Sequence, residues 1–321
     1  MNRRFDPRRG LALALLLPLV ACKSTAPEPE PAQLTPLNEL PAEYADLWRA
    51  WKTRSPEYPD LRDAALADPA RTRFLVENLI DDLLTELTAG NVDTGREDQS
   101  PRYRVVGAEL VHLGPHSAPA LAEVMTFGLG LGPVAVEGLL LQIGTPAVAP
   151  LVGLLERKEP VARRRGAKAL GEIQPDFADP RLDHPAVRAA LGARLQSDDD
   201  WIVRSQCALA MARWGRHDPE TAADAARYLV PALADADLDV RKDVVHGLAR
   251  LGDPRTFPAL FNYLERSERD GDPSAVLLTQ AALTAMTRNK QAHTVAEWRA
   301  WWSRERPGIL QRFLGTAPAP R

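Results

Sequence analysis

This sequence has few cysteines, no excess of positive charge and no long apolar run. It has two cysteines among 321 residues, and its 40 Lys and Arg residues face 43 Asp and Glu residues. The lack of a basic excess argues against nucleic acid as a partner, and the lack of a polybasic stretch argues against electrostatic docking on a membrane. The apolar run at residues 11–20 is only half of the roughly 20 residues that span a bilayer, which argues against a transmembrane helix there.

The N-terminus has the three parts of a secretory signal peptide. Its basic residues are Arg3, Arg4, Arg8 and Arg9. The apolar run follows them, and the small residue Ala21 precedes Cys22 at the end of the segment. A basic region, a short apolar region and small residues at the cleavage point describe such a peptide. The order Leu-Val-Ala-Cys also resembles the lipobox of bacterial lipoproteins.

In bacterial lipoproteins the chain is cleaved before the lipobox cysteine, here between Ala21 and Cys22, and the lipidated cysteine becomes the new N-terminus. The resemblance implies three acyl chains on Cys22. Each buried methylene contributes about 0.8 kcal/mol, so this anchor would be almost permanent. Lys23 stands where aspartate often retains such proteins in the inner membrane. We therefore expect a lipid-anchored envelope protein on the outer membrane, facing the periplasm. Cys207 would then have no partner for an intramolecular disulfide.

Composition divides the chain into a leader, a tether and a helical part. Prolines and glutamates recur after Cys22, and such a segment extends by ~3.1 Å per residue, which gives a reach of about 60 Å. From Glu43 onward, apolar residues fall at three- and four-residue spacing, as in amphipathic helices. The predicted segments are the signal peptide 1–21, the lipidated tether 22–42, an N-terminal helical cap region 43–100, a repeat array 101–290, a tryptophan-rich capping helix 291–314 and a disordered tail 315–321.

The helical part contains marked helix ends and a repeated hairpin. Residues 69–88 are predicted to form one helix, with Asp68 as its N-cap and Gly90 as its stop. Beyond it, a helix, a glycine-centred turn and a second helix recur several times. The turn glycines are Gly114, Gly144, Gly171, Gly215 and Gly252. The wide interval after Gly171 contains residues 174–183, which are rich in proline and aspartate and are predicted to form a loop.

Three details of these hairpins resemble HEAT repeats. A first helix opens with Asp-Val-Arg at 239–241, and Arg163 and Arg204 stand at comparable places. Turns read Leu-Gly-Pro or Ile-Gly-Thr-Pro, and second helices begin with Ala-Pro or Pro-Ala-Leu. Together with the lipobox, these details make the chain similar to bacterial HEAT-repeat lipoproteins. Over about 102–288 the resemblance implies an all-α fold, an α-solenoid or right-handed superhelix of HEAT-like helical hairpins. Such an array is stable only as a stack with capped ends.

Two groups of residues allow a binding interpretation and a structural one. Arg163, Arg204 and Arg241 could form a cationic stripe, but such residues form a polar ladder between repeats in HEAT arrays, which we favour. The tryptophans near the two ends could form a ligand platform. They are Trp48 and Trp51, and Trp298, Trp301 and Trp302, of which the last three share one helical face. We expect these tryptophans to cover the cores of the terminal repeats.

Residue patterns that would indicate chemistry are weak. Cys207 lies on an apolar helix face and is expected in the core. His112 and His116 are separated by Gly-Pro without a metalloprotease glutamate, and residues 91–98 lack the oxygen spacing of a calcium loop. A glycine run consists of Gly128, Gly130 and Gly132. No strand precedes this run, so it is expected to separate two helices rather than to hold a phosphate. We therefore predict no catalytic residue, no metal and no cofactor.

The sequence as a whole predicts a binding scaffold rather than an enzyme. Stacked helix pairs create long surfaces that bind proteins or peptides. We expect a non-catalytic scaffold for other envelope proteins or peptides, held to the membrane by its N-terminal lipid and binding no nucleic acid. If second helices line the concave side, the partner surface contains Arg157, Arg194, Arg227 and Arg266. An enzyme or lyase-like accessory subunit and a purely structural envelope component stay open as alternatives.

Overall fold

The computed structural model describes residues 40–88, 101–126, 131–180 and 182–315, and all regular structure in these residues is helical. The first helices are α1 (Ala42–Thr53), α2 (Tyr58–Leu66) and α3 (Pro69–Thr88). The next are α4 (Pro101–Leu113), α5 (Ala118–Val124), α6 (Leu131–Ile143), α7 (Val148–Leu155), α8 (Pro160–Glu172) and α9 (His184–Ser197). The last are α10 (Trp201–Trp214), α11 (Pro219–Ala232), α12 (Leu238–Leu251), α13 (Phe257–Arg269), α14 (Pro273–Thr287) and α15 (Val295–Gly315). The prediction of an all-α fold is confirmed.

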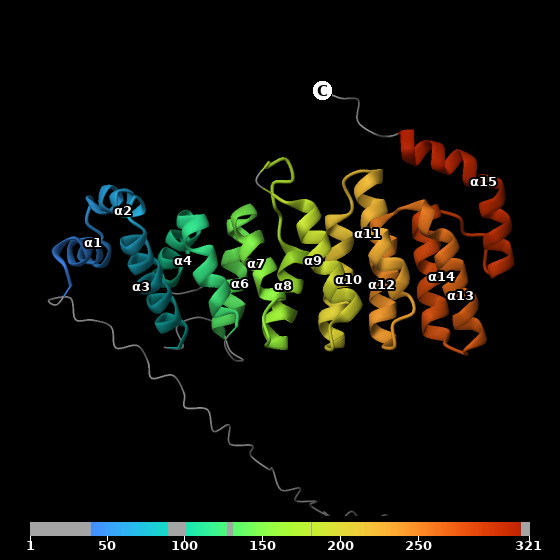
Figure 1. Cartoon of the computed structure of the whole chain (residues 1–321), viewed down its shortest axis with the longest axis horizontal. Helices are drawn as coiled ribbons and strands as arrows, with labels where there is room; N and C mark the ends of the chain where they lie inside the picture. Colours follow the sequence, from blue (N-terminus) through green and yellow to red (C-terminus); the bar gives the residue numbers. More distant parts are fainter. Residues whose placement is uncertain (1–39, 89–100, 127–130, 181, 316–321) are drawn as a thin grey trace, which may run out of the picture.

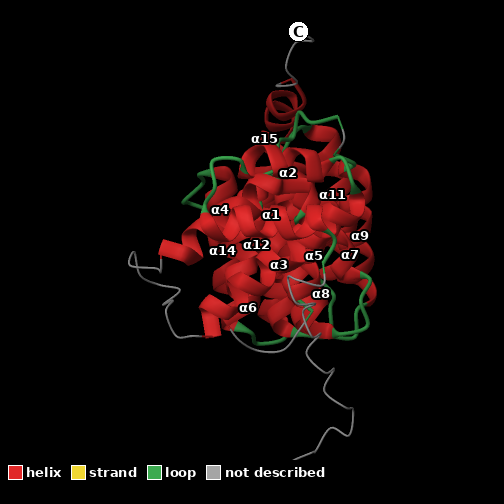
Figure 2. Ribbon diagram, turned by 90° about the vertical axis from the view of Figure 1, so that its left-hand side faces the viewer, coloured by secondary structure: helices red, strands yellow, loops and turns green. Residues whose placement is uncertain are grey.

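The helices stand in a row, so that each hairpin packs against its neighbours in the chain (Figure 1). An end-on view separates two layers, with α4, α12 and α14 on one side and α5, α7, α9 and α11 on the other (Figure 2). Within the first layer α10 packs between α8 and α12, and within the second α9 packs between α7 and α11. Because each repeat contacts mainly its neighbours, the array is an α-solenoid, as predicted.

Aspartate side chains mark the beginnings of many of these helices. The side chain of Asp68 accepts a hydrogen bond from the backbone N–H of Ala70 at 2.8 Å, which confirms it as the cap of α3. The aspartates that cap later helices in the same way are Asp183, Asp200, Asp218, Asp237 and Asp272. Each such cap satisfies backbone donors that the helix leaves unpaired and contributes about 1 kcal/mol.

Three of the predicted turn glycines have the positive φ that a sharp hairpin turn requires, and the first of them, Gly114, has φ of 45°. Gly144 has φ of 72° and Gly252 has φ of 71°, a conformation in which a Cβ atom would be strained. The prediction for Gly171 was wrong. This residue lies within α8, and a Cβ at its position would be 3.5 Å from the Cα of Ala210 in α10. Its place is therefore a helix–helix contact, and the turn follows after Ile173.

One continuous core runs along the stack from Leu47 to Trp302. Small residues allow its helices to approach closely. A Cβ at Gly247 of α12 would lie 2.9 Å from the carbonyl oxygen of Ala208 in α10, so only glycine fits this contact. The predicted loop at 174–183 contains no helix in its described residues. No helix in the described part of the chain is long and apolar enough to cross a membrane.

Several predictions concern residues outside the described part of the chain. They are the signal peptide with Ala21 and Cys22, the tether up to residue 39, Gly90 with the acidic segment 91–98, Gly128 and Gly130, and residues 316–321. Gly132 is described and lies in the first turn of α6. The predicted helix at 69–88 agrees with α3, and the predicted capping helix corresponds to α15, which begins at Val295.

Candidate functional site

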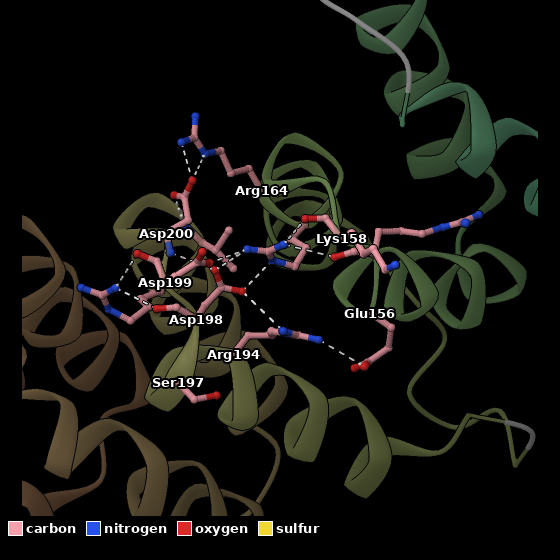
Figure 3. A network of polar contacts seen from close by, with 12 residues as sticks. Glu156, Lys158, Arg164, Arg194, Ser197, Asp198, Asp199 and Asp200 are labelled. Atoms are coloured by element: carbon pink, nitrogen blue, oxygen red, sulfur yellow. Dashed lines mark hydrogen bonds and ion pairs between the residues drawn. The ribbon is translucent and has the colours of Figure 1, made fainter. Parts of the chain in front are cut away.

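The arginines at the starts of first helices form a ladder between repeats, and Figure 3 shows its first rung around Asp198. Arg163 of α8 donates from Nε and Nη2 to the two carboxylate oxygens of Asp198, at 2.7 and 2.8 Å. Its Nη1 donates to the carbonyls of Arg157 and Lys158, at 3.1 and 2.7 Å. Both members of the ion pair are buried, with 7% and 0% of their side chains exposed. One guanidinium therefore joins the loop before its own helix to the loop of the next repeat.

The second rung repeats this geometry one hairpin later. Arg204 of α10 donates from Nε and Nη2 to the carboxylate of Asp235, at 2.8 and 2.9 Å. Its Nη1 donates to the carbonyls of Asp198 at 2.8 Å and of Asp199 at 3.5 Å. Such parallel N–H···O bonds between a guanidinium and a carboxylate are strong and directional, so they fix how one repeat is rotated on the next.

Arg241 of α12 occupies the same position but keeps only part of the pattern. Its Nη1 donates to the carbonyls of Asp235 and Ala236, at 2.6 and 3.1 Å. The ladder interpretation is thus confirmed for Arg163 and Arg204, which are engaged within the protein and do not form a free cationic stripe. The incomplete third rung is a feature that the sequence analysis missed.

The ladder aspartates are ionised more easily than free aspartate. Burial alone would raise the pKa of Asp198, but hydrogen bonds from the Arg163 guanidinium and from the backbone N–H of Asp200 outweigh it, and the pKa is lowered. Burial and the Arg204 guanidinium oppose each other in the same way at Asp235, whose pKa is also lowered. These carboxylates are therefore charged under all near-neutral conditions.

Acid is expected to weaken the protein through these groups. Because their folded-state pKa lies below the unfolded value of about 3.9, their stabilisation is complete above that pH and is lost as the pH falls through the folded-state pKa. Thermal unfolding measured between about pH 5 and pH 2 should therefore show a falling midpoint. The difference in midpoint between the wild type and Arg163→Ala should shrink over the same range. A constant difference would contradict the assignment.

The four arginines predicted as a partner surface lie at the ends or on the faces of second helices, and each has a partner within the protein. Arg157, after α7, pairs with Glu123 of α5. Arg194 of α9 pairs with Glu156 at 3.2 Å and with the rung aspartate at 3.7 Å.

The two later arginines continue this series along the stack. Arg227 pairs with Asp224 on its own helix α11, and Asp224 also accepts from Arg188 of α9 at 2.6 Å. Arg266 of α13 donates to the carbonyl of Leu233 at the end of α11. We call Arg157, Arg194, Arg227 and Arg266 the second-helix edge. The structure does not bring these arginines into one cluster. Each of them belongs to a different hairpin of the array.

The tryptophans at both ends are packing residues. Trp298 of α15 is fully buried, and its ring stacks on Phe261 with centroids 6.4 Å apart. Trp302 meets Phe257 at 5.0 Å in an edge-to-face contact. At the other end, Trp48 is buried, and the indole N–H of Trp51 donates to Asp82 at 3.4 Å. These contacts are those that the capping interpretation predicts.

A cleft that the sequence analysis did not identify lies between the N-terminal cap and the first repeat. It has a volume of about 380 Å³ and is lined by residues of α1, α2 and α4. Tyr58 donates to Glu109 at 2.9 Å there, and Lys52 donates to Asp82 at 2.5 Å. The Tyr58–Glu109 bond ties the cap region to α4 of the array, and the Lys52–Asp82 pair joins α1 to α3 within the cap region. The sequence alone gives no signal for them, because the partners lie 30 or more positions apart.

The cysteine and histidines that were considered for catalysis or metal binding lie in structural positions. Cys207 has no exposed surface, and burial raises the pKa of its thiol, as expected of a core residue rather than a nucleophile. His112 lies in the last turn of α4, and His116 belongs to the following 3₁₀ turn. Within the described ranges, no group of three or more His, Cys, Asp or Glu side chains is placed to hold a metal ion.

Comparison with known proteins agrees with this architecture. Residues 133–212 and 188–279 match the family model of HEAT repeats, so this part of the chain contains HEAT-like repeats. No curated protein matches the sequence. Among solved structures, the crystal structure of an engineered protein is similar with a TM-score of 0.40 and 17% identity, over 66% of this chain and 96% of that one. A similarity this low says nothing about function.

Proposed function

We propose that this protein is a non-catalytic scaffold, anchored to the envelope membrane by a lipid on Cys22, that binds other envelope proteins or peptides along its second-helix edge. The HEAT-like array supports the scaffold part of the proposal, because such stacks present long surfaces and no enclosed active site. The lipobox pattern that ends at Cys22 supports the anchor.

The observation that carries the binding surface is the regular row of four arginines on second helices, of which Arg157 and Arg227 are in exposed charge pairs. Arg157 is 43% exposed and its partner Glu123 is 54% exposed, and the side chain of Arg227 is 72% exposed. An exposed ion pair contributes about 0–1 kcal/mol. An acidic segment of a partner can therefore replace the internal carboxylates at little cost, and the one-per-hairpin spacing would set its register.

The proposal is tested by capturing partners from native membranes with the detergent-solubilised full chain. A variant that reverses all four charges of the second-helix edge to glutamate is expected to lose most of the recovered partner. The matched control reverses four exposed arginines elsewhere, namely Arg49, Arg73, Arg304 and Arg306. It changes the net charge equally and should capture like the wild type.

A second version of the edge variant, with glutamine in place of glutamate, guards against misfolding and should also lose capture. The Cys22→Ala chain is expected in the soluble fraction with its capture intact, which separates anchoring from binding. Equal partner recovery by the edge variants and the control variant would rule out this surface.

A further inference from the structure

The third rung of the arginine ladder lacks the carboxylate that completes the first two. In each of those rungs, the aspartate stands two residues before the aspartate that caps the next first helix, as Asp235 stands before Asp237. By this spacing, Asp270 is the counterpart before the capping Asp272, and Arg241 is the arginine it should meet. Among the described residues, however, Arg241 forms no ion pair, and its Nε and Nη2 have no hydrogen-bond acceptor.

The loop of the third rung differs from the other two at its middle residue. The three loops read Asp-Asp-Asp at 198–200, Asp-Ala-Asp at 235–237 and Asp-Gly-Asp at 270–272. Gly271 has φ of 69°, whereas the middle residues of the other two loops do not have a positive φ. The left-handed residue redirects the chain. The side chain of Asp270 is 60% exposed and lies 3.7 Å from Arg269 instead of meeting Arg241.

A cavity of about 440 Å³ lies where the third rung would be. Arg241, Arg266 and Tyr263 line it. Tyr263 is only 3% exposed, and its hydroxyl has no hydrogen-bond partner within the described structure. An unpaired buried hydroxyl costs about 1–3 kcal/mol, so it indicates a place where a polar group binds. Arg241 lines the same cavity, and its donor nitrogens Nε and Nη2 have no acceptor among the described residues.

The charges around the cavity favour a carboxylate over a dianion. Three aspartates also line the cavity, namely Asp235, Asp270 and Asp272. Asp235 is already bound by Arg204 through two hydrogen bonds, and Asp272 accepts the backbone N–H of Ala275 at 3.0 Å. These negative charges would repel a phosphate dianion more strongly than a single carboxylate. The first two rungs show directly how a carboxylate fits the same arginine position.

We propose that this cavity binds an aspartate or glutamate side chain on an extended segment of a partner protein, in the orientation that Asp198 takes on Arg163. The partner carboxylate accepts from Nε and Nη2 of Arg241 and from the hydroxyl of Tyr263. The biological role of this site depends on the proposed scaffold function. The site adds that the partner segment is acidic. It also adds a defined pocket to a surface that otherwise offers exposed pairs.

The test follows the side-chain Nε–H NMR signal of Arg241 in the full chain with Cys22→Ala. One probe is the acetylated, amidated peptide Leu-Ala-Asp-Ala-Asp-Leu, which copies residues 233–238, and the other is sodium acetate exchanged for sodium chloride. We expect both probes to shift the Arg241 signal in a saturable way. The same peptide with Asn for Asp should leave it unchanged. The signals of Arg163 and Arg204 are internal controls and should not respond, because their carboxylates are supplied by the protein.

Two variants sharpen the result. Gly271→Ala recreates the Asp-Ala-Asp loop of the preceding repeat and disfavours the positive φ. It should shift the Arg241 signal toward those of Arg163 and Arg204 without any probe, and weaken the peptide at least tenfold. Tyr263→Phe should weaken the peptide several-fold without unfolding the protein.

The proposal is overturned if the Asn peptide shifts Arg241 as the Asp peptide does, if no probe shifts it, or if Gly271→Ala binds the peptide as tightly as the wild type. Acetate binding without peptide binding would show a small-anion site and would overturn the partner assignment. Because the titration uses isolated protein, its success together with failed membrane capture would refute the scaffold and keep the site.

Discussion

Replacing Arg163 with alanine is expected to lower the free energy of unfolding by about 3–5 kcal/mol, the cost of leaving one member of a buried ion pair without its partner. The side chain of Asp198 has no exposed surface, and its remaining ion-pair contact, with Arg194, is longer at 3.7 Å. The substitution also removes two hydrogen bonds to the carbonyls of Arg157 and Lys158. Both losses fall at one junction between repeats, where the other arginine–aspartate pairs, Arg164 with Asp200 and Arg163 with Asp199, each include a more exposed side chain.

Urea unfolding followed by circular dichroism measures this loss, and Arg227→Ala is the matched control. Arg227 also pairs with an aspartate, but its side chain is 72% exposed, so its removal should cost less than about 1 kcal/mol. The double variant Arg163→Met with Asp198→Leu should recover much of the stability, because it leaves no unpaired charge. If Arg163→Ala and Arg227→Ala cost the same, the buried rung does not hold the repeats together.

Replacing Trp298 with alanine is expected to cost a similar amount, about 3–5 kcal/mol, the range for a large aromatic residue removed from a core. Trp298 is fully buried between α15 and α13, where it stacks on Phe261. Its loss would open a cavity and expose the apolar end of the last repeat. Since a repeat array needs polar caps to remain soluble, we also expect faster aggregation on heating.

Trp201→Ala provides the comparison for this experiment, because Trp201 is 43% exposed at the start of α10. Its removal should change stability by no more than about 0.5 kcal/mol. Thermal unfolding and light scattering on both variants distinguish a cap from a ligand platform. A ligand platform predicts that Trp298→Ala folds as stably as the wild type and loses only binding.

Features that depend on neighbouring residues could be predicted from the sequence. The predicted helix at 69–88 and its cap Asp68 agree with the structure. Both depend only on nearby residues, since a helix is indicated by the spacing of its apolar residues and Asp68 caps the backbone N–H of Ala70, two positions away. The left-handed turns at Gly144 and Gly252 were found for the same reason. Gly171 was misassigned because a glycine near a helix end has the same local pattern whether it ends the helix or allows another helix to approach.

The candidate sites depended on distant partners and were predicted less completely. The ladder could be named from its arginines, but no spacing rule gives the missing third rung or the positive φ of Gly271 beside it. The second-helix edge was chosen for its charges. The sequence could not show that Arg194 already pairs with Glu156, because the two residues lie 38 positions apart.

The sequence by itself determined an all-helical chain of repeated hairpins with a lipobox-like N-terminus and tryptophan-rich ends. Those properties follow from residue type and from the spacing of apolar residues, which involve only a few neighbouring positions of the chain. Only the tertiary structure decided which distant charges meet, since the ladder pairs and the Arg194–Glu156 pair join residues 31–38 positions apart. It alone also decided that Nε and Nη2 of Arg241 have no acceptor in a cavity that Tyr263 also lines, because that depends on how one loop turns against the next repeat.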